Sequence, residues 1–172
     1  WYKKWFRKNY MYNHEHYKWV STTQFKNVFD NIIKFEDDDL SAKLEQALKR
    51  QENLLSAPHY YAKQVLVKAA RIAKEDVRSA LLMLFDEEKP LSDRADEFIS
   101  QMRDIVNANK AEEQSNEKFG YKETSQQNMH AVSVYLSFMY PDRHYIFKSS
   151  VWDDFRDIIG LSYPSLSVYT HR

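Results

Sequence analysis

The chain has 172 residues, and its 25 basic and 25 acidic side chains give a formal net charge of zero. This balance argues against a protein whose whole surface binds a phosphate backbone, although it allows a local basic patch. With 43% hydrophobic and 15% aromatic residues, the composition argues against intrinsic disorder. Cysteine is absent, which excludes disulfides and thiolate chemistry and makes the cytoplasm the simplest compartment.

Glycine is scarce, with Gly120 and Gly160 as its two occurrences. A β-rich domain needs many turns with positive φ, which glycine usually supplies, so the composition favours helices. The sequence contains no signal peptide and no uninterrupted apolar run of about 18 residues, so no membrane partner is expected. Because the chain begins at Trp1 instead of methionine, we interpret it as a piece of a longer protein.

The first elements in chain order are a lead segment and three predicted helices. Residues 1–20 hold eight aromatic and five basic residues against the single acid Glu15. The first helix is predicted by helical spacing of Phe25, Val28, Phe29, Ile32 and Ile33. Acids at 37–39 suit the start of a second helix with apolar residues at 40, 44, 47 and 48. Pro58 suits the first turn of a third helix, which is apolar on more than one side and is therefore expected at the centre.

Two more amphipathic helices follow, and then a polar stretch. The fourth helix has its apolar stripe at Val77, Ala80, Leu81, Leu84 and Phe85. The fifth is expected to be capped by Ser92 or Asp93 and to bury Ala95, Phe98, Ile99, Met102, Ile105 and Val106. Residues 107–124 are polar and are expected to form a mobile loop.

The last part of the chain predicts two helices around a turn. Helical spacing from Met129 to Met139 ends at Pro141, and residues 145–147 favour an extended backbone. Ser150 and Gly160 suit the two ends of a final helix whose inner face is Trp152, Phe155 and Ile159. We therefore expect one compact, mainly α-helical domain over residues 1–172, with minor extended structure near 145–147.

Two basic-aromatic patches are candidate nucleic-acid sites, because aromatic rings stack on bases and cations follow the phosphates. The first lies in the lead segment and includes Lys18 and Trp19. The second consists of Arg143, Tyr145 and Lys148 around the turn after Pro141, with Lys122 from the preceding loop. The alternatives are that the tryptophans seal a helical core and that the turn is an ordinary solvated one.

Signals for catalysis, cofactors and metals are missing. Two glycines 40 residues apart cannot build a phosphate-binding loop, and each acidic run flanks a helix end, where the helix dipole explains it. The run from His14 to His16 could offer metal ligands, but no second ligand cluster accompanies it, and His130 fits a half-buried, hydrogen-bonded histidine better than a metal ligand. We therefore expect no catalytic residue, no cofactor and no metal, and no enzyme activity in this chain.

Four segments together resemble one protein family. They are TTQFKNVFD at 22–30, NLLSAPHYYAKQVLVKAA at 53–70, EDVRSALLMLFDEEKPLSDRADEF at 75–98 and HAVSVYLSFMYPDRHYIFKSS at 130–150. In this order they resemble the N-terminal region of McrB-like AAA-family NTPases from bacterial modification-dependent restriction systems. The resemblance implies a defence protein in which this region precedes a GTP- or ATP-hydrolysing module that drives a nuclease subunit. None of the motifs of that module lies in these residues.

Two functions remain open. In the first, the domain binds DNA, including modified DNA, through Lys18, Trp19, Lys122, Arg143, Tyr145 and Lys148, and its affinity falls steeply with salt. In the second, it is a non-catalytic protein-interaction or spacer domain that docks on the NTPase module or on a partner subunit. An exposed apolar patch would mark the second function.

Overall fold

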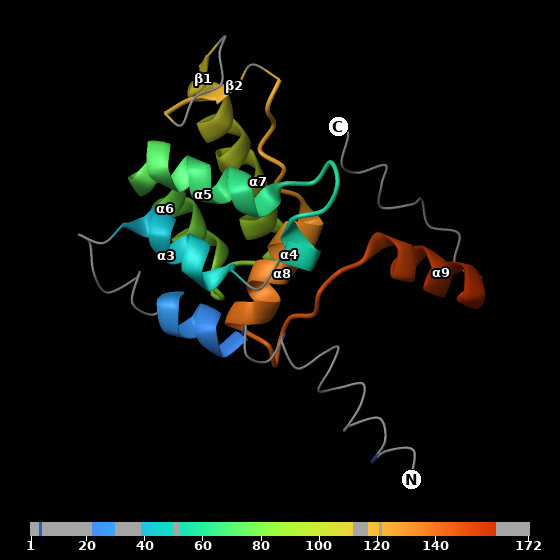
Figure 1. The fold of residues 1–172 in the computed structure, drawn as a ribbon. Coiled ribbons are helices and arrows are strands. Elements are labelled where there is room, and N and C mark those ends of the chain that lie inside the picture. Colours follow the sequence, from blue (N-terminus) through green and yellow to red (C-terminus); the bar gives the residue numbers. More distant parts are fainter. Residues whose placement is uncertain are drawn as a thin grey trace.

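The computed structural model describes residues 4, 22–29, 39–49, 52–111, 117–120 and 122–160. These residues are mostly helical, which confirms the predicted mainly α-helical fold (Figure 1). The lead segment lies outside the described residues apart from Lys4, and so do the predicted core residues Ile32 and Ile33. A helical stretch at 22–29, blue and without a label in Figure 1, comes first. It is followed by α3 (Leu40–Ala47), α4 (Glu52–Leu55), α5 (Ala62–Ile72), α6 (Lys74–Leu84), α7 (Leu91–Ala108), β1 (Lys110–Ala111), β2 (Phe119–Gly120), α8 (Met129–Met139) and α9 (Ser149–Ile159).

Helix α5 lies at the centre of the first part of the bundle, as predicted. It packs against α3 on one side and α6 on another, and it also contacts α4 and α7 (Figure 1). Its buried residues are small or branched and surround much of the helix: Ala62, Val65, Leu66, Val67, Ala69 and Ala70. The side chain of Asp39 caps α3 by accepting from the Ala42 N–H at 3.1 Å, consistent with the predicted acidic start.

Helix α8 is buried over almost its whole length. Every residue from 131 to 136 is buried, together with Phe138 and Met139. The Asn128 side chain caps its start by accepting from the Ala131 N–H at 3.0 Å. The helix ends at Met139, just before Tyr140 and Pro141, as the sequence predicts. Because α8 is surrounded by other elements, it forms the frame on which the following turn is held.

An aromatic cluster closes the bundle where α6 and α8 end. Phe25 and Phe29 stack at a ring-centroid distance of 4.9 Å, and Phe85 meets Phe29 edge-on at 4.6 Å. Phe138 lies 6.0 Å from Phe25, and Tyr140 lies 6.3 Å from Phe85. Such edge and offset contacts add about 0.5–1.5 kcal/mol per pair to the burial of the rings. The cluster therefore joins the 22–29 helix to the ends of α6 and α8.

Pro58 does not start a helix. It lies in a tight turn in which Ala57 and Tyr60 exchange backbone hydrogen bonds of 2.8 and 2.9 Å. His59 adopts a φ of 68° in this turn, in the left-handed region, which an α-helix cannot accommodate. Helix α5 therefore begins only at Ala62.

Two predicted caps are also wrong. Helix α7 begins at Leu91 after an extended Pro90, so Ser92 and Asp93 lie inside its first turn, where the Ser92 hydroxyl bonds the Asp93 carboxylate at 3.0 Å. Helix α9 begins at Ser149 after Lys148, which places Ser150 inside the helix. Gly160 does end α9, with a φ of 69° that glycine adopts without strain.

The expected mobile loop at 107–124 is partly ordered structure. Helix α7 continues to Ala108, and β1 pairs in parallel with β2. Phe119 is buried, and the Lys68 ammonium lies 4.8 Å above its ring centroid while bonding the Glu123 carboxylate at 3.2 Å. The prediction of a loop from the polar composition therefore overlooked the buried ring of Phe119, which packs this segment onto the bundle. Residues 112–116 and 121 lie outside the described part.

Candidate interaction surface

The turn after α8 is tied to the α6–α7 connection through Glu87. One carboxylate oxygen of Glu87 accepts from Arg94 at 2.6 Å and from the Nε2 of His144 at 2.9 Å. The other accepts from Arg143 at 2.9 Å. Close by, the Tyr140 hydroxyl donates to the carbonyl of Phe85 at 2.7 Å. The contacts of Tyr140, Arg143 and His144 join residues more than 50 positions apart and fasten the turn to the bundle.

The charge of Glu87 is strongly stabilised. Burial alone would raise its pKa, but hydrogen bonds from His144, Arg94 and Arg143 outweigh burial and lower the pKa to about 2. Arg94 is only 4% exposed and also donates to the Leu84 carbonyl at 3.0 Å. The cluster is therefore well explained as a structural ion-pair network.

The residues predicted for the second basic patch differ in how available they are. Arg143 is 70% exposed, but its guanidinium is paired with Glu87, so part of its charge is already neutralised. Tyr145 is 81% exposed, and Lys148 is exposed a few residues further along. The side chains of Tyr145 and Lys148 make no hydrogen bond to another described residue. The structure therefore brings Arg143, Tyr145 and Lys148 into one exposed stretch.

The other predicted site residues do not join that stretch. Lys122 is exposed and follows β2, on the connection that leads into the start of α8, whereas Arg143 follows the end of α8. Figure 1 shows β2 and the turn after α8 at opposite ends of the bundle. Lys18 and Trp19 lie outside the described residues.

Phe147 immediately precedes Lys148, the N-cap of α9, and is anchored to the bundle. Its N–H donates to the Ser133 hydroxyl at 2.8 Å, and its carbonyl lies 2.7 Å from the Nδ1 of His130. The Nε2 of His130 lies 2.9 Å from the carbonyl of Leu54 in α4. His130 is half-buried and hydrogen-bonded, as the sequence predicts, and it fastens the base of α9 to two helices.

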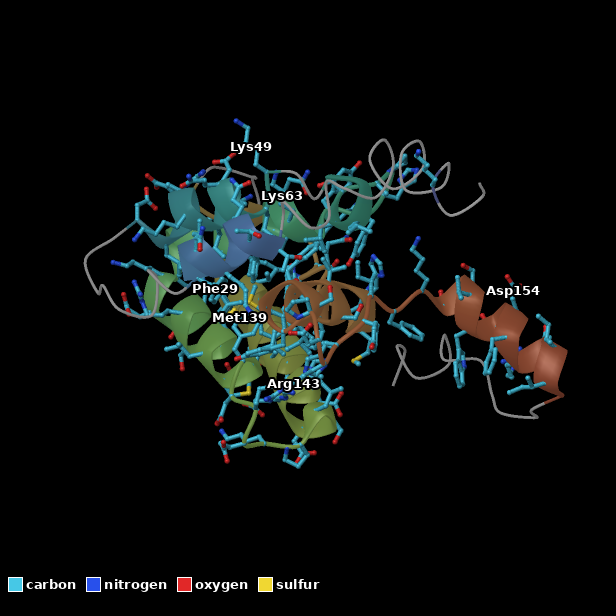
Figure 2. All side chains as sticks on the ribbon, turned by 90° about the horizontal axis from the view of Figure 1, so that it is seen from below. Phe29, Lys49, Lys63, Met139, Arg143 and Asp154 are labelled. Carbon is cyan, nitrogen blue, oxygen red and sulfur yellow. The ribbon has the colours of Figure 1, made fainter. Side chains whose placement is uncertain are left out.

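Helix α9 projects away from the bundle, beyond the connection at 144–148 (Figures 1 and 2). None of its residues is buried, although it has the amphipathic pattern of a core helix. At 100° per residue its apolar residues occupy one arc of about 120°. They are Val151, Trp152, Phe155, Ile158 and Ile159, which we call the α9 apolar face. Ile158 is 83% exposed, and all but the half-buried Trp152 are exposed.

The polar side of α9 is acidic. Arg156 pairs with Asp153 at 3.3 Å and with Asp157 at 3.1 Å, so its charge is compensated within the helix. Asp154 borders the α9 apolar face on the edge opposite Arg156. Its carboxylate has no ion-pair or hydrogen-bond partner among the described residues. Figure 2 shows Asp154 on the projecting helix, well away from Arg143 on the bundle. The face therefore combines exposed apolar side chains with an uncompensated negative edge.

The apolar stripe of α9 is present as the sequence predicts, but the expectation that Trp152, Phe155 and Ile159 face the core is wrong. A pattern of apolar residues shows that a helix has one apolar face, but not what covers that face. The Glu87 network was missed, although Arg94 lies four residues before Phe98 on the buried stripe of α7. An arginine at such a position requires an anionic partner, which is the signal that could have predicted it.

Comparisons with protein-family models, with curated proteins and with solved structures find no match to this chain. Within the described ranges, no group of three or more histidine and acidic side chains is arranged to hold a metal ion. No helix in the same part of the chain is long and apolar enough to cross a membrane.

Proposed function

We propose that this chain is a non-catalytic interaction domain that docks on a partner protein through the α9 apolar face. The observation that carries the proposal is the exposure of four of the five side chains of the α9 apolar face, on a helix whose base is held by the bundle. Contiguous exposed apolar side chains are costly in water and mark interaction sites. A helix offered in this way binds by laying its apolar side chains into a groove of the partner.

The charges of α9 define the chemistry of that partner. Asp154 lies beside the apolar stripe without a described partner, and Arg156 on the other edge is already paired with two aspartates. The complementary surface is an apolar groove with a lysine or arginine on the rim that meets Asp154. A partner subunit or the NTPase module of a McrB-like protein is the kind of partner that the sequence resemblance implies.

Site-specific photocrosslinking in living cells tests this proposal. We expect a photoreactive amino acid at position 155 to capture one partner, and the same probe at position 153, on the polar side, to capture none. The captured protein must then bind the purified chain, with an affinity that falls at least tenfold for Ile158→Ala and unchanged for Asp153→Asn. Equal capture from both positions, or equal affinity of Ile158→Ala, would overturn the proposal.

A second candidate function is DNA binding, as in the recognition region of a McrB-like restriction protein. The exposed stretch with Tyr145 and Lys148 favours it, because it presents an exposed aromatic ring and an exposed cation three positions apart in the sequence. The expected result is micromolar duplex binding at low salt. Lys148→Ala should lower the salt slope by about one, and Arg143→Ala by less, because Glu87 already pairs with Arg143. No binding to methylated or unmethylated, single- or double-stranded DNA at low salt would exclude this function.

A further inference from the structure

The ring of His130 is placed between two carbonyl oxygens. Nδ1 lies 2.7 Å from the oxygen of Phe147, and Nε2 lies 2.9 Å from the oxygen of Leu54. A backbone carbonyl can only accept a hydrogen bond, so each ring nitrogen must donate. A neutral imidazole carries one N–H, whereas the imidazolium carries two. The geometry is therefore complementary to the positively charged ring.

We propose that His130 is a pH-dependent clamp at the base of α9. When the ring is protonated it donates to both carbonyls. It then links Phe147, which precedes Lys148 and α9, to Leu54 in α4. When it loses a proton, one nitrogen faces a carbonyl lone pair, so one of the two contacts must open. Because His130 also belongs to the buried helix α8, the protonated ring holds α9 in a fixed position on the bundle.

The effect of this clamp on partner binding rests on the proposed function. The α9 apolar face is the proposed docking element, and Phe147 is the anchored residue nearest its start. Closing the clamp fixes the direction in which the face is presented, which lowers the entropic cost of binding. Opening it gives α9 more freedom. Acidification would then strengthen docking, and a rise in pH would weaken it.

The other titratable and charged groups near the clamp make different contacts. The Tyr60 ring lies 6.0 Å from that of His130, and burial raises the pKa of Tyr60, which keeps it neutral. In the connection to α9, His144 bonds Glu87, while Tyr145 and Lys148 are exposed. Helix α4 contributes Glu52, whose side chain lies outside the described part. His130 is thus the group that joins α4, α8 and this connection.

Nuclear magnetic resonance on the full chain without a partner tests the clamp. At pH 5 we expect the ¹⁵N shifts of the His130 ring to show two protonated nitrogens. Over the pH interval in which the ring spectrum shows the loss of one of these protons, the exchange protection of the Phe147 amide should fall about tenfold. The protection in His130→Gln, which has one donor group, should be low and independent of pH.

His59→Asn is the matched control, because His59 is exposed and asparagine tolerates its positive φ. In His59→Asn the exchange protection of the Phe147 amide should depend on pH as it does in the wild type. A single protonated ring nitrogen at pH 5, or the same pH dependence in His130→Gln, would overturn the clamp. If His130→Gln does not fold, the wild type alone decides, because the protection of the Phe147 amide must fall together with the loss of the ring proton, and protection that does not change with the ring spectrum would overturn the clamp. Since no partner is present, failure of the clamp is distinct from failure of α9 docking.

Discussion

The guanidinium of Arg94 donates to the carboxylate of Glu87 at 2.6 Å, and the same side chain reaches the carbonyl of Leu84 at 3.0 Å. Arg94 therefore holds the end of α6, the turn after it and the start of α7 together. Arg143 and His144 extend this contact to the chain that leaves α8. The connection to α9 thus begins from a fixed point on the bundle.

Replacing Glu87 with glutamine should lower the stability in a pH-dependent way. The pKa of Glu87 falls from the ordinary 4.5 to about 2, which at about 1.4 kcal/mol per pH unit corresponds to about 3 kcal/mol. A lowered carboxyl pKa stabilises the fold above the unfolded-state value and loses this effect as the pH falls through the folded-state value. Urea unfolding should therefore show a deficit of up to about 3 kcal/mol at pH 7 for Glu87→Gln, shrinking between pH 4.5 and pH 2. A deficit that is constant over this range would contradict the assigned network.

Truncating Phe85 to alanine should cost about 3–5 kcal/mol of unfolding free energy. Phe85 is 6% exposed and meets Phe25, Phe29 and Tyr140 in the aromatic cluster, so its removal leaves a cavity that these rings cannot close. Denaturant unfolding provides the measurement, with Leu82→Ala on the exposed side of α6 as the control. A loss below about 1 kcal/mol for Phe85→Ala would show that α6 packs through another face.

Asn128→Ala should destabilise the protein by about 1–2 kcal/mol. The Asn128 side chain accepts both from the Ala131 N–H at 3.0 Å and from the Tyr60 hydroxyl at 3.2 Å, so its loss uncaps α8 and removes the partner of a hydroxyl on a partly buried ring. Thermal unfolding of Asn128→Ala and of Asn128→Asp provides the measurement, because aspartate preserves an acceptor for both donors and should keep most of the stability that alanine loses. If the aspartate variant is as unstable as the alanine variant, the side-chain oxygen has no capping role.

Much of the fold could be predicted from the periodicity of the sequence. The predicted stripe of α3 is buried at Leu40 and Leu44 and at its C-cap, Leu48. The predicted stripe of α6, from Val77 to Leu84, is buried as well. The helix starts were less predictable, because Pro90 and Lys148 begin helices without a side-chain cap while nearby serines lie inside them. Phe119 was hidden in a polar stretch because one buried ring leaves no periodic pattern.

The candidate site was predictable only in part. The sequence places Arg143, Tyr145 and Lys148 in one segment, but no local pattern shows that Glu87, 56 residues earlier, pairs with Arg143. The pairing of the two His130 nitrogens depends on Leu54, which is 76 residues away. Contacts over such separations follow from packing of the whole bundle, and not from propensity or spacing.

The central claim is that the α9 apolar face is open in the isolated chain and is covered by a partner protein. Methyl relaxation by a dissolved paramagnetic reagent measures this directly at Ile158, with the exposed Leu82 and the buried Leu136 as references. In the isolated chain Ile158 should relax at least as strongly as Leu82, and in the complex with the protein captured from position 155 it should become as shielded as Leu136. Shielding of Ile158 in the isolated chain, or its continued exposure in that complex, would contradict the claim.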